Sequence, residues 1–170
     1  MRREGTGGRC GLGALVGGCV FAALMPLTLR AADCSASATS VVFGVYDATA
    51  PAPTDSTGTL TVTCTYTPSG SRTILYTVGL HSGNGTTAAV RWLASGNYRL
   101  FYNLFTDPAR LLIWGDGTSG TQLVSGSLKV GPGVGNGTRS DVFTVYGRMP
   151  ARQDANAGDY SDTIVFTLTF

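Results

Sequence analysis

Apolar and polar residues alternate along the last part of the chain. Ile164, Phe166, Leu168 and Phe170 are separated by one valine and two threonines. Residues two apart in a strand point to the same face, so the pattern predicts a strand with all four large apolar side chains on one side. Such a strand needs a partner from this chain or another, because an unpaired edge exposes backbone N–H and C=O groups. Assembly is therefore the first function to consider.

Short apolar runs separated by turn-forming residues make up most of the rest of the chain. The Gly- and Asn-rich stretches 82–85 and 131–137 are typical of loops, and no stretch of helical apolar spacing interrupts the pattern. Regular short strands with such turns predict an all-β fold, a β-sandwich. Five aromatic residues are expected in its core, namely Trp92, Phe101, Tyr102, Phe105 and Trp114. The predicted strands are 39–46, 59–66, 73–80, 88–93, 98–105, 111–114, 121–129, 141–148 and 160–170.

The start of the chain has the pattern of a secretory signal peptide. Three arginines lie within the first nine residues, an uncharged run follows from residue 11 to residue 29, and Ala31 offers a small-residue cleavage site. We therefore expect residues 1–31 to be a signal peptide and residues 32–170 to form one exported domain. An uncleaved membrane anchor and a lipoprotein site at Cys19 are the alternative interpretations.

Cleavage after Ala31 changes the charge of the chain. Four of the twelve Lys and Arg residues and one of the ten Asp and Glu residues would leave with the signal peptide, so eight basic and nine acidic residues remain, a net charge of about −1. No basic patch remains that would attract a nucleic acid. We expect no membrane partner once the signal peptide has been removed.

Two cysteines, Cys34 and Cys64, remain after the predicted cleavage. In an oxidising compartment, two cysteines most simply form one disulfide. A metal site is the competing hypothesis, but two thiols and the single His81 are too few ligands for a closed zinc site. We expect a Cys34–Cys64 disulfide and no metal.

Residues that could carry catalysis are sparse. His81 has no acid or nucleophile in a recognisable frame around it. The glycine run 131–137 lacks the Lys-Ser/Thr ending of a phosphate loop, and Asp154, Asp159 and Asp162 lack the spacing of a calcium loop. We therefore expect neither an enzyme nor a cofactor, and we interpret these acids as turn-forming and edge-protecting residues.

Several short blocks stand out along nearly the whole predicted mature chain. They are Cys34, Val42-Phe43-Gly44-Val45-Tyr46-Asp47, 58–64, 99–107, Trp114-Gly115-Asp116-Gly117, Tyr146-Gly147-Arg148, Gln153 and 158–163. These blocks, in this order, resemble the spore coat protein U domain family, whose members look like pilin and coat subunits of archaic chaperone–usher systems.

The resemblance implies an immunoglobulin-like β-sandwich that lacks its final strand and so has an open groove. It implies that a periplasmic chaperone fills the groove with an extended segment. At an outer-membrane usher, a neighbouring pilin or coat subunit then replaces that segment. The protein would be exported through the periplasm to the cell surface as part of a pilus or coat. The residues expected to line the groove or the core beneath it are Val41, Phe43, Val45, Ile164, Phe166, Leu168 and Phe170.

The predicted cleavage site also bears on the place of this subunit in an assembly. A donor subunit needs roughly ten residues ahead of its domain to span a groove of strand length. Cleavage after Ala31 leaves only Ala32 and Asp33 before Cys34. We therefore expect a subunit that accepts a strand without donating one, at a tip or a terminus; cleavage near Cys19 would reverse this. The alternative function is a self-complete monomeric coat or carbohydrate-binding β-sandwich.

Overall fold

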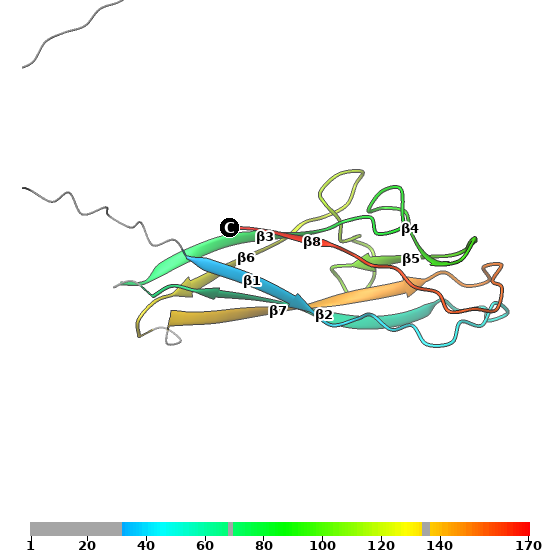
Figure 1. Ribbon diagram of the computed structural model, residues 1–170, viewed down its shortest axis with the longest axis horizontal. Coiled ribbons are helices and arrows are strands. Elements are labelled where there is room, and N and C mark those ends of the chain that lie inside the picture. Colours follow the sequence, from blue (N-terminus) through cyan, green and yellow to red (C-terminus); the bar gives the residue numbers. More distant parts are fainter. Residues whose placement is uncertain (1–31, 68–69, 134–136) are drawn as a thin grey trace, which may run out of the picture.

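The computed structural model describes residues 32–67, 70–133 and 137–170, in which all regular structure is β-strand (Figure 1). The predicted signal peptide and part of the predicted loop 131–137 lie outside these ranges. Two antiparallel sheets face each other. The first contains, in spatial order, β1 (Asp33–Ala38), β2 (Thr54–Thr65), β7 (Thr138–Met149), β5 (Tyr98–Phe105) and β4 (Arg91–Ser95). The second contains β6 (Val124–Val130), β3 (Arg72–Leu80) and β8 (Phe166–Thr169).

The core lies between the two sheets, and period-two alternation fills it. Alternate residues of a strand point to the same face, so each strand contributes every second side chain. The buried residues of β2, β3 and β5 include Leu60, Val62, Cys64, Ile74, Tyr76, Val78, Leu80, Leu100, Tyr102 and Leu104. Trp114 is fully buried beside them and donates its indole N–H to the carbonyl of Val78 at 3.0 Å. This arrangement is an immunoglobulin-like β-sandwich, and the all-β prediction is confirmed.

The predicted aromatic core is only partly correct. Tyr102 and Trp114 are buried, but Phe101 points to the opposite face of β5 and is 47% exposed. There it packs edge-on against Trp92 of the neighbouring strand. Adjacent residues of a strand cannot both face the core, so Phe101 and Tyr102 could not share it.

A disulfide joins the first strand to the second. Cys34 and Cys64 face each other in the β1–β2 register, and their sulfur atoms lie 2.02 Å apart. The sequence predicted this pairing from the number of cysteines and the compartment. The bond fastens β1, an edge strand of the five-stranded sheet, to the buried side of β2.

Several strand boundaries differ from the predicted ones. Segment 98–105 is correct, but the first strand is β1 and not segment 39–46, which continues from β1 without regular pairing. Segment 111–114 forms only isolated bridges, at Ile113 and Trp114. The last predicted strand, 160–170, is divided: Ser161 bridges to Ala94 of β4, and the chain then crosses to pair with β3 as β8. In residues 32–67, 70–133 and 137–170, no helix is long and apolar enough to span a membrane.

Candidate functional site

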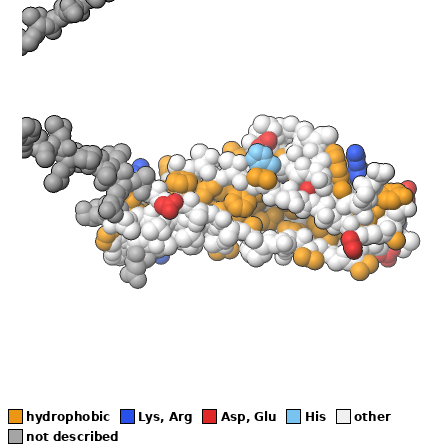
Figure 2. Space-filling view, in the orientation of Figure 1, with side chains coloured by type: hydrophobic (Ala, Val, Ile, Leu, Met, Phe, Trp, Pro, Cys, Tyr) orange, Lys and Arg blue, Asp and Glu red, His pale blue; other side chains and the backbone are white. Residues whose placement is uncertain are grey.

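Along one side of the sandwich, each of the two sheets ends in a strand with an open edge. In the described chain, β1 pairs only with β2 and β8 pairs only with β3, so each leaves one side without a strand partner. Segments 38–46 and 155–166 face each other there across two cavities of about 350 and 590 Å³. Val41, Phe43, Leu93 and Asp162 line both cavities, which therefore form one continuous groove. Figure 2 shows apolar atoms exposed along the middle of this face.

One wall of the groove is segment 39–46, which crosses the inner faces of β2 and β7. Two strand glycines allow the crossing. A Cβ atom on Gly147 would lie 2.7 Å from Val41 Cγ1 and 2.8 Å from Phe43 Cζ, and a Cβ on Gly58 would lie 2.9 Å from Val41 Cγ2. No side chain fits at either position, so the wall can lie directly on the sheet.

Hydrogen bonds hold this wall at its middle and at its far end. The Ser56 hydroxyl donates to the carbonyl of Val42 at 2.6 Å. At the far end, the Tyr46 hydroxyl donates to the carbonyl of Pro150 and accepts the amide N–H of Gln153, both at 2.8 Å. The wall is thereby tied to β2 and to the chain that follows β7.

Of the residues predicted on this wall, Val41 and Phe43 are half-buried and line the groove. Phe43 packs edge-on against Tyr102, with ring centroids 5.8 Å apart. Val45 lies at the rim of the larger cavity but is 96% exposed, so it is not a core residue. Gly44 has a φ of +74°, which interrupts the extended backbone, and Tyr46 points inward in place of Val45.

The second wall is the chain from Asp162 to Phe166. Ile164 and Phe166 are half-buried and line the groove, and Leu168 packs against the core farther along β8. Phe170 is 54% exposed and lies apart from the groove, in a cavity of about 360 Å³ that Ala32 also lines. The alternation is therefore correct through Leu168, and Phe170 does not join the core.

Polar groups place the second wall against β3. The amide N–H of His81 donates to the carbonyl of Val165 at 2.9 Å. The His81 Nε2 and Thr167 Oγ1 atoms are hydrogen-bonded at 2.8 Å. His81, the only histidine of the chain, therefore lies at the junction of β3 and β8.

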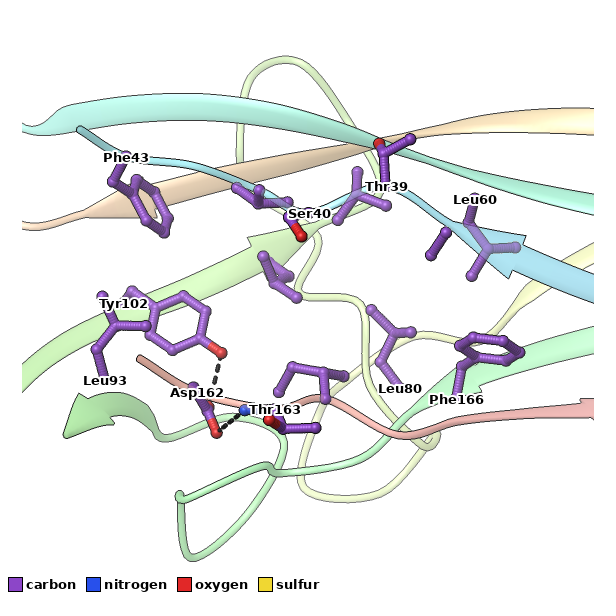
Figure 3. A pocket seen from close by; sticks show the side chains of 15 residues that line it. Thr39, Ser40, Phe43, Leu60, Leu80, Leu93, Tyr102, Asp162, Thr163 and Phe166 are labelled. Carbon is purple, nitrogen blue, oxygen red and sulfur yellow. Dashed lines mark hydrogen bonds between the residues drawn. The ribbon is translucent and has the colours of Figure 1, made fainter. Parts of the chain in front are cut away.

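A pair formed by a hydroxyl and a carboxylate joins the groove floor to the second wall (Figure 3). The Tyr102 hydroxyl donates to Asp162 Oδ2 at 2.7 Å, while Asp162 Oδ1 accepts the amide N–H groups of Asn84 at 2.8 Å and Thr163 at 2.7 Å. Burial, together with the hydrogen bond to Asp162, raises the pKa of Tyr102, so the phenol stays protonated. The turn-forming interpretation of Asp162 accounts for its two amide contacts but missed its contact with Tyr102.

Other floor residues were also not singled out from the sequence. Leu80, Leu93, Leu104 and Val145 line the groove from four different strands. Period two places a leucine or valine on the inner face of its strand, but it does not show which inner face stays uncovered. Only the arrangement of the two sheets identifies these residues as groove residues.

The exposed backbone edges are suited to a strand partner. Along β8 there is no charged residue, and along β1 the only one is Asp33 at its start. The opposite edge strand of the three-stranded sheet, β6, carries Lys129, a residue type that protects edges from pairing. No group of three or more side chains that could hold a metal ion occurs among the described residues.

Fold and groove together define an immunoglobulin-like β-sandwich with two open strand edges on one side. The chain belongs to the Spore Coat Protein U domain family, since the model of that family matches residues 21–167. It is 40% identical over 119 residues to Protein U of Myxococcus xanthus, a match that covers 67% of this chain and 59% of that protein. The chain therefore spans about three fifths of the length of this relative.

A solved structure shares the fold. It is the CsuC–CsuE chaperone–tip adhesion subunit pre-assembly complex from archaic chaperone-usher Csu pili of Acinetobacter baumannii. The match has a TM-score of 0.52 and 24% sequence identity, and it covers 82% of this chain and 40% of the matched chain. At this level of identity, the similarity is one of fold.

Proposed function

We propose that this protein is a structural subunit of a chaperone–usher-assembled pilus or surface coat, and that it is not an enzyme. Its groove accepts an extended strand, first from a periplasmic chaperone and then, at an outer-membrane usher, from a neighbouring subunit. The subunit is exported through the periplasm to the cell surface. Family membership and the shared fold with a pilus subunit complex support this proposal.

The observation that carries the proposal is the groove between segments 39–46 and 162–166, which continue from the unpaired, nearly uncharged edges of β1 and β8. An inserted strand would bond to the free backbone groups of an edge and cover Val41, Phe43, Ile164 and Phe166. Fully covering two large apolar side chains contributes roughly 3–6 kcal/mol. The total stability of a single domain is only about 5–15 kcal/mol, so an added strand would change the stability of this protein measurably.

A donor segment fused through a short linker after Phe170 of the full chain tests the proposal. A segment with alternating apolar residues should raise the melting temperature by about 10 °C or more. A fused segment of the same composition without alternation is the matched control. Phe166→Asp should abolish the gain, because it places a charge in the groove. If the unfused protein is a stable monomer and no fusion changes its melting temperature, the self-complete coat or carbohydrate-binding protein is the better hypothesis.

The tip or terminal position is a separate part of the proposal. It is supported by the predicted cleavage after Ala31, which leaves two residues before Cys34. The family match begins at residue 21, ahead of that site. N-terminal sequencing of the exported protein tests it: a start at Ala32 supports an acceptor-only subunit, and a start at or before Cys19 contradicts it.

A further inference from the structure

Polar and apolar residues both line the groove, and at its centre the Tyr102 hydroxyl and the Asp162 carboxylate form what we call the polar notch. Asp162 lines both cavities, so the notch lies where they join. Figure 3 shows the Tyr102 hydroxyl pointing from the floor toward Asp162, with Ser40 and Phe43 on the opposite wall. An inserted strand must pass over this point.

Apolar side chains flank the notch on both sides, beside the polar residues Thr39, Ser40 and Thr163 in the first cavity and Asn156, Asp159 and Ser161 in the second. Leu80, Ile164 and Phe166 line only the first cavity, and Leu100 and Met149 line only the second. A strand lying along the groove therefore meets the apolar side chains of the first cavity, then the Asp162 carboxylate, which lines both cavities, then the apolar side chains of the second. Its inward-facing side chains, which are two residues apart, meet these three environments in turn.

The carboxylate of Asp162 can accept a further hydrogen bond. Each carboxylate oxygen has about two acceptor positions. Oδ1 already accepts two amide N–H groups, but Oδ2 accepts only the Tyr102 hydroxyl among the hydrogen bonds that the structure shows. A strand with an apolar residue at the notch would remove water from Oδ2 without replacing it, and an unsatisfied buried charge is costly.

From these contacts we infer that the strand accepted by this groove carries a serine or threonine at the one inward-facing position that meets Asp162. The inward-facing positions on either side of it carry apolar residues. The inference rests on the proposed function. It assigns Asp162 and Tyr102 as residues that determine the specificity and register of the donor strand. A lysine would also meet the charge, but its ammonium group would lose water in a groove that Phe43 and Leu93 also line.

A peptide scan tests the inference. The full chain is expressed and exported, and the mature protein is purified. It is mixed with a synthetic peptide in which apolar and polar residues alternate and every inward-facing position is valine. Each valine is then replaced in turn by threonine, which has nearly the same shape, and in a second series by lysine. Affinity is obtained from the dependence of the melting temperature on peptide concentration. Threonine should weaken binding at the flanking positions and tighten it about tenfold at one position, because hydrogen bonds to charged groups are the stronger ones.

Two variants should change this threonine preference in opposite directions. Asp162→Asn keeps an oxygen for the two amides but removes the charge, and should reduce the tenfold preference to about threefold. Tyr102→Phe removes the existing donor to Oδ2 and should increase the preference. Tyr160→Phe is the matched control, since Tyr160 lines the same groove but donates to the carbonyl of Asn156, and it should leave the preference unchanged.

The outcomes separate the two proposals. If peptides bind but valine or lysine is preferred over threonine at every position, the inference is wrong while the acceptor function stands. The same holds if Tyr102→Phe acts no differently from Tyr160→Phe. If no peptide of the series binds, the acceptor function fails and the inference fails with it.

Discussion

Among single residues, Arg91 organises the region behind the groove. It is the one fully buried charged side chain in the described ranges. Its guanidinium donates to the carbonyls of Leu80 at 3.2 Å, His81 at 2.9 Å and Trp114 at 3.0 Å, and to Asn103 Oδ1 at 2.7 Å. Burial lowers the pKa of Arg91, but an arginine stays charged at neutral pH. One side chain thus joins the end of β3, the start of β4 and the Trp114 segment.

Arg91→Met should therefore destabilise the protein strongly. The variant leaves the carbonyl groups of Leu80, His81 and Trp114 without this donor, the first and last of them buried, and we expect the free energy of unfolding to fall by about 3–5 kcal/mol. Chemical denaturation measures the change. Arg139→Met, at an exposed position of β7, is the control and should change stability by less than about 0.5 kcal/mol. Equal effects of the two substitutions would contradict this account of Arg91.

Exposed carboxylates should make the protein sensitive to acid. Hydrogen bonding to Arg148 at 2.7 and 2.8 Å lowers the pKa of Asp55, and the amide of Leu112 lowers the pKa of Asp107. A carboxylate whose pKa is lower in the folded state stabilises it above the unfolded pKa of about 3.9, and this contribution is lost as the pH falls through the folded pKa. The melting temperature should therefore fall below about pH 4. Asp55→Asn should flatten that part of the profile; an unchanged profile would show that the Asp55–Arg148 pair does not contribute.

At the level of elements, the wall formed by segment 39–46 depends on what lies under it. Its run of valine, phenylalanine and tyrosine residues is typical of a strand, yet in the structure it is a crossing segment that lies on Gly58 and Gly147. Strand glycines often mark a close approach of another backbone. The packing of Val41 and Phe43 on β7 therefore explains the glycine in the family block Tyr146-Gly147-Arg148.

Gly147→Ala should displace this wall. The new Cβ would lie within 2.8 Å of both Val41 and Phe43, and overpacking of this kind costs about 1–3 kcal/mol of stability. Since both residues line the groove, the gain in melting temperature from a fused donor segment should also shrink. Gly79→Ala is the control, because the atom nearest its new Cβ, at 3.0 Å, is the end of the flexible Leu123 side chain. If both variants lose the same stability, the wall does not depend on Gly147.

At the scale of the whole molecule, the edge strands of the two sheets differ in the charge that they expose. Lys129 lies on β6, whereas β1 and β8 expose uncharged Ser, Ala and Thr residues beside the groove. A free edge of this kind is a template for another strand, whether from a donor or from a second copy. The same feature that suits the protein for assembly should therefore make the isolated chain prone to association.

Lysines introduced at the two open edges should reduce that association. Ser37→Lys with Thr169→Lys should keep the protein monomeric at concentrations at which the unaltered protein associates, as measured by size-exclusion chromatography with light scattering. Thr57→Lys with Thr144→Lys adds the same charge on the outer face of β2 and β7, away from the edges, and is the matched control. If the control pair prevents association equally well, net charge rather than edge pairing is the cause.

The sequence by itself determined the local and covalent features. Period two located β3 and β5, because alternation depends only on neighbouring residues, and the two cysteines left after the predicted cleavage predicted the disulfide. The blocks from Cys34 to Gln153 and beyond identified the family, which carries the sandwich fold with it.

Only the tertiary structure decided where these elements lie relative to one another. Alternation predicted the same role for Val45 and Phe170 as for Phe43 and Phe166, but a left-handed Gly44 turned Val45 outward, and Phe170 lies apart from the groove. The Tyr102–Asp162 contact joins residues 60 positions apart. Such contacts depend on how two sheets meet, and no short-range pattern in a sequence encodes which edge is left open.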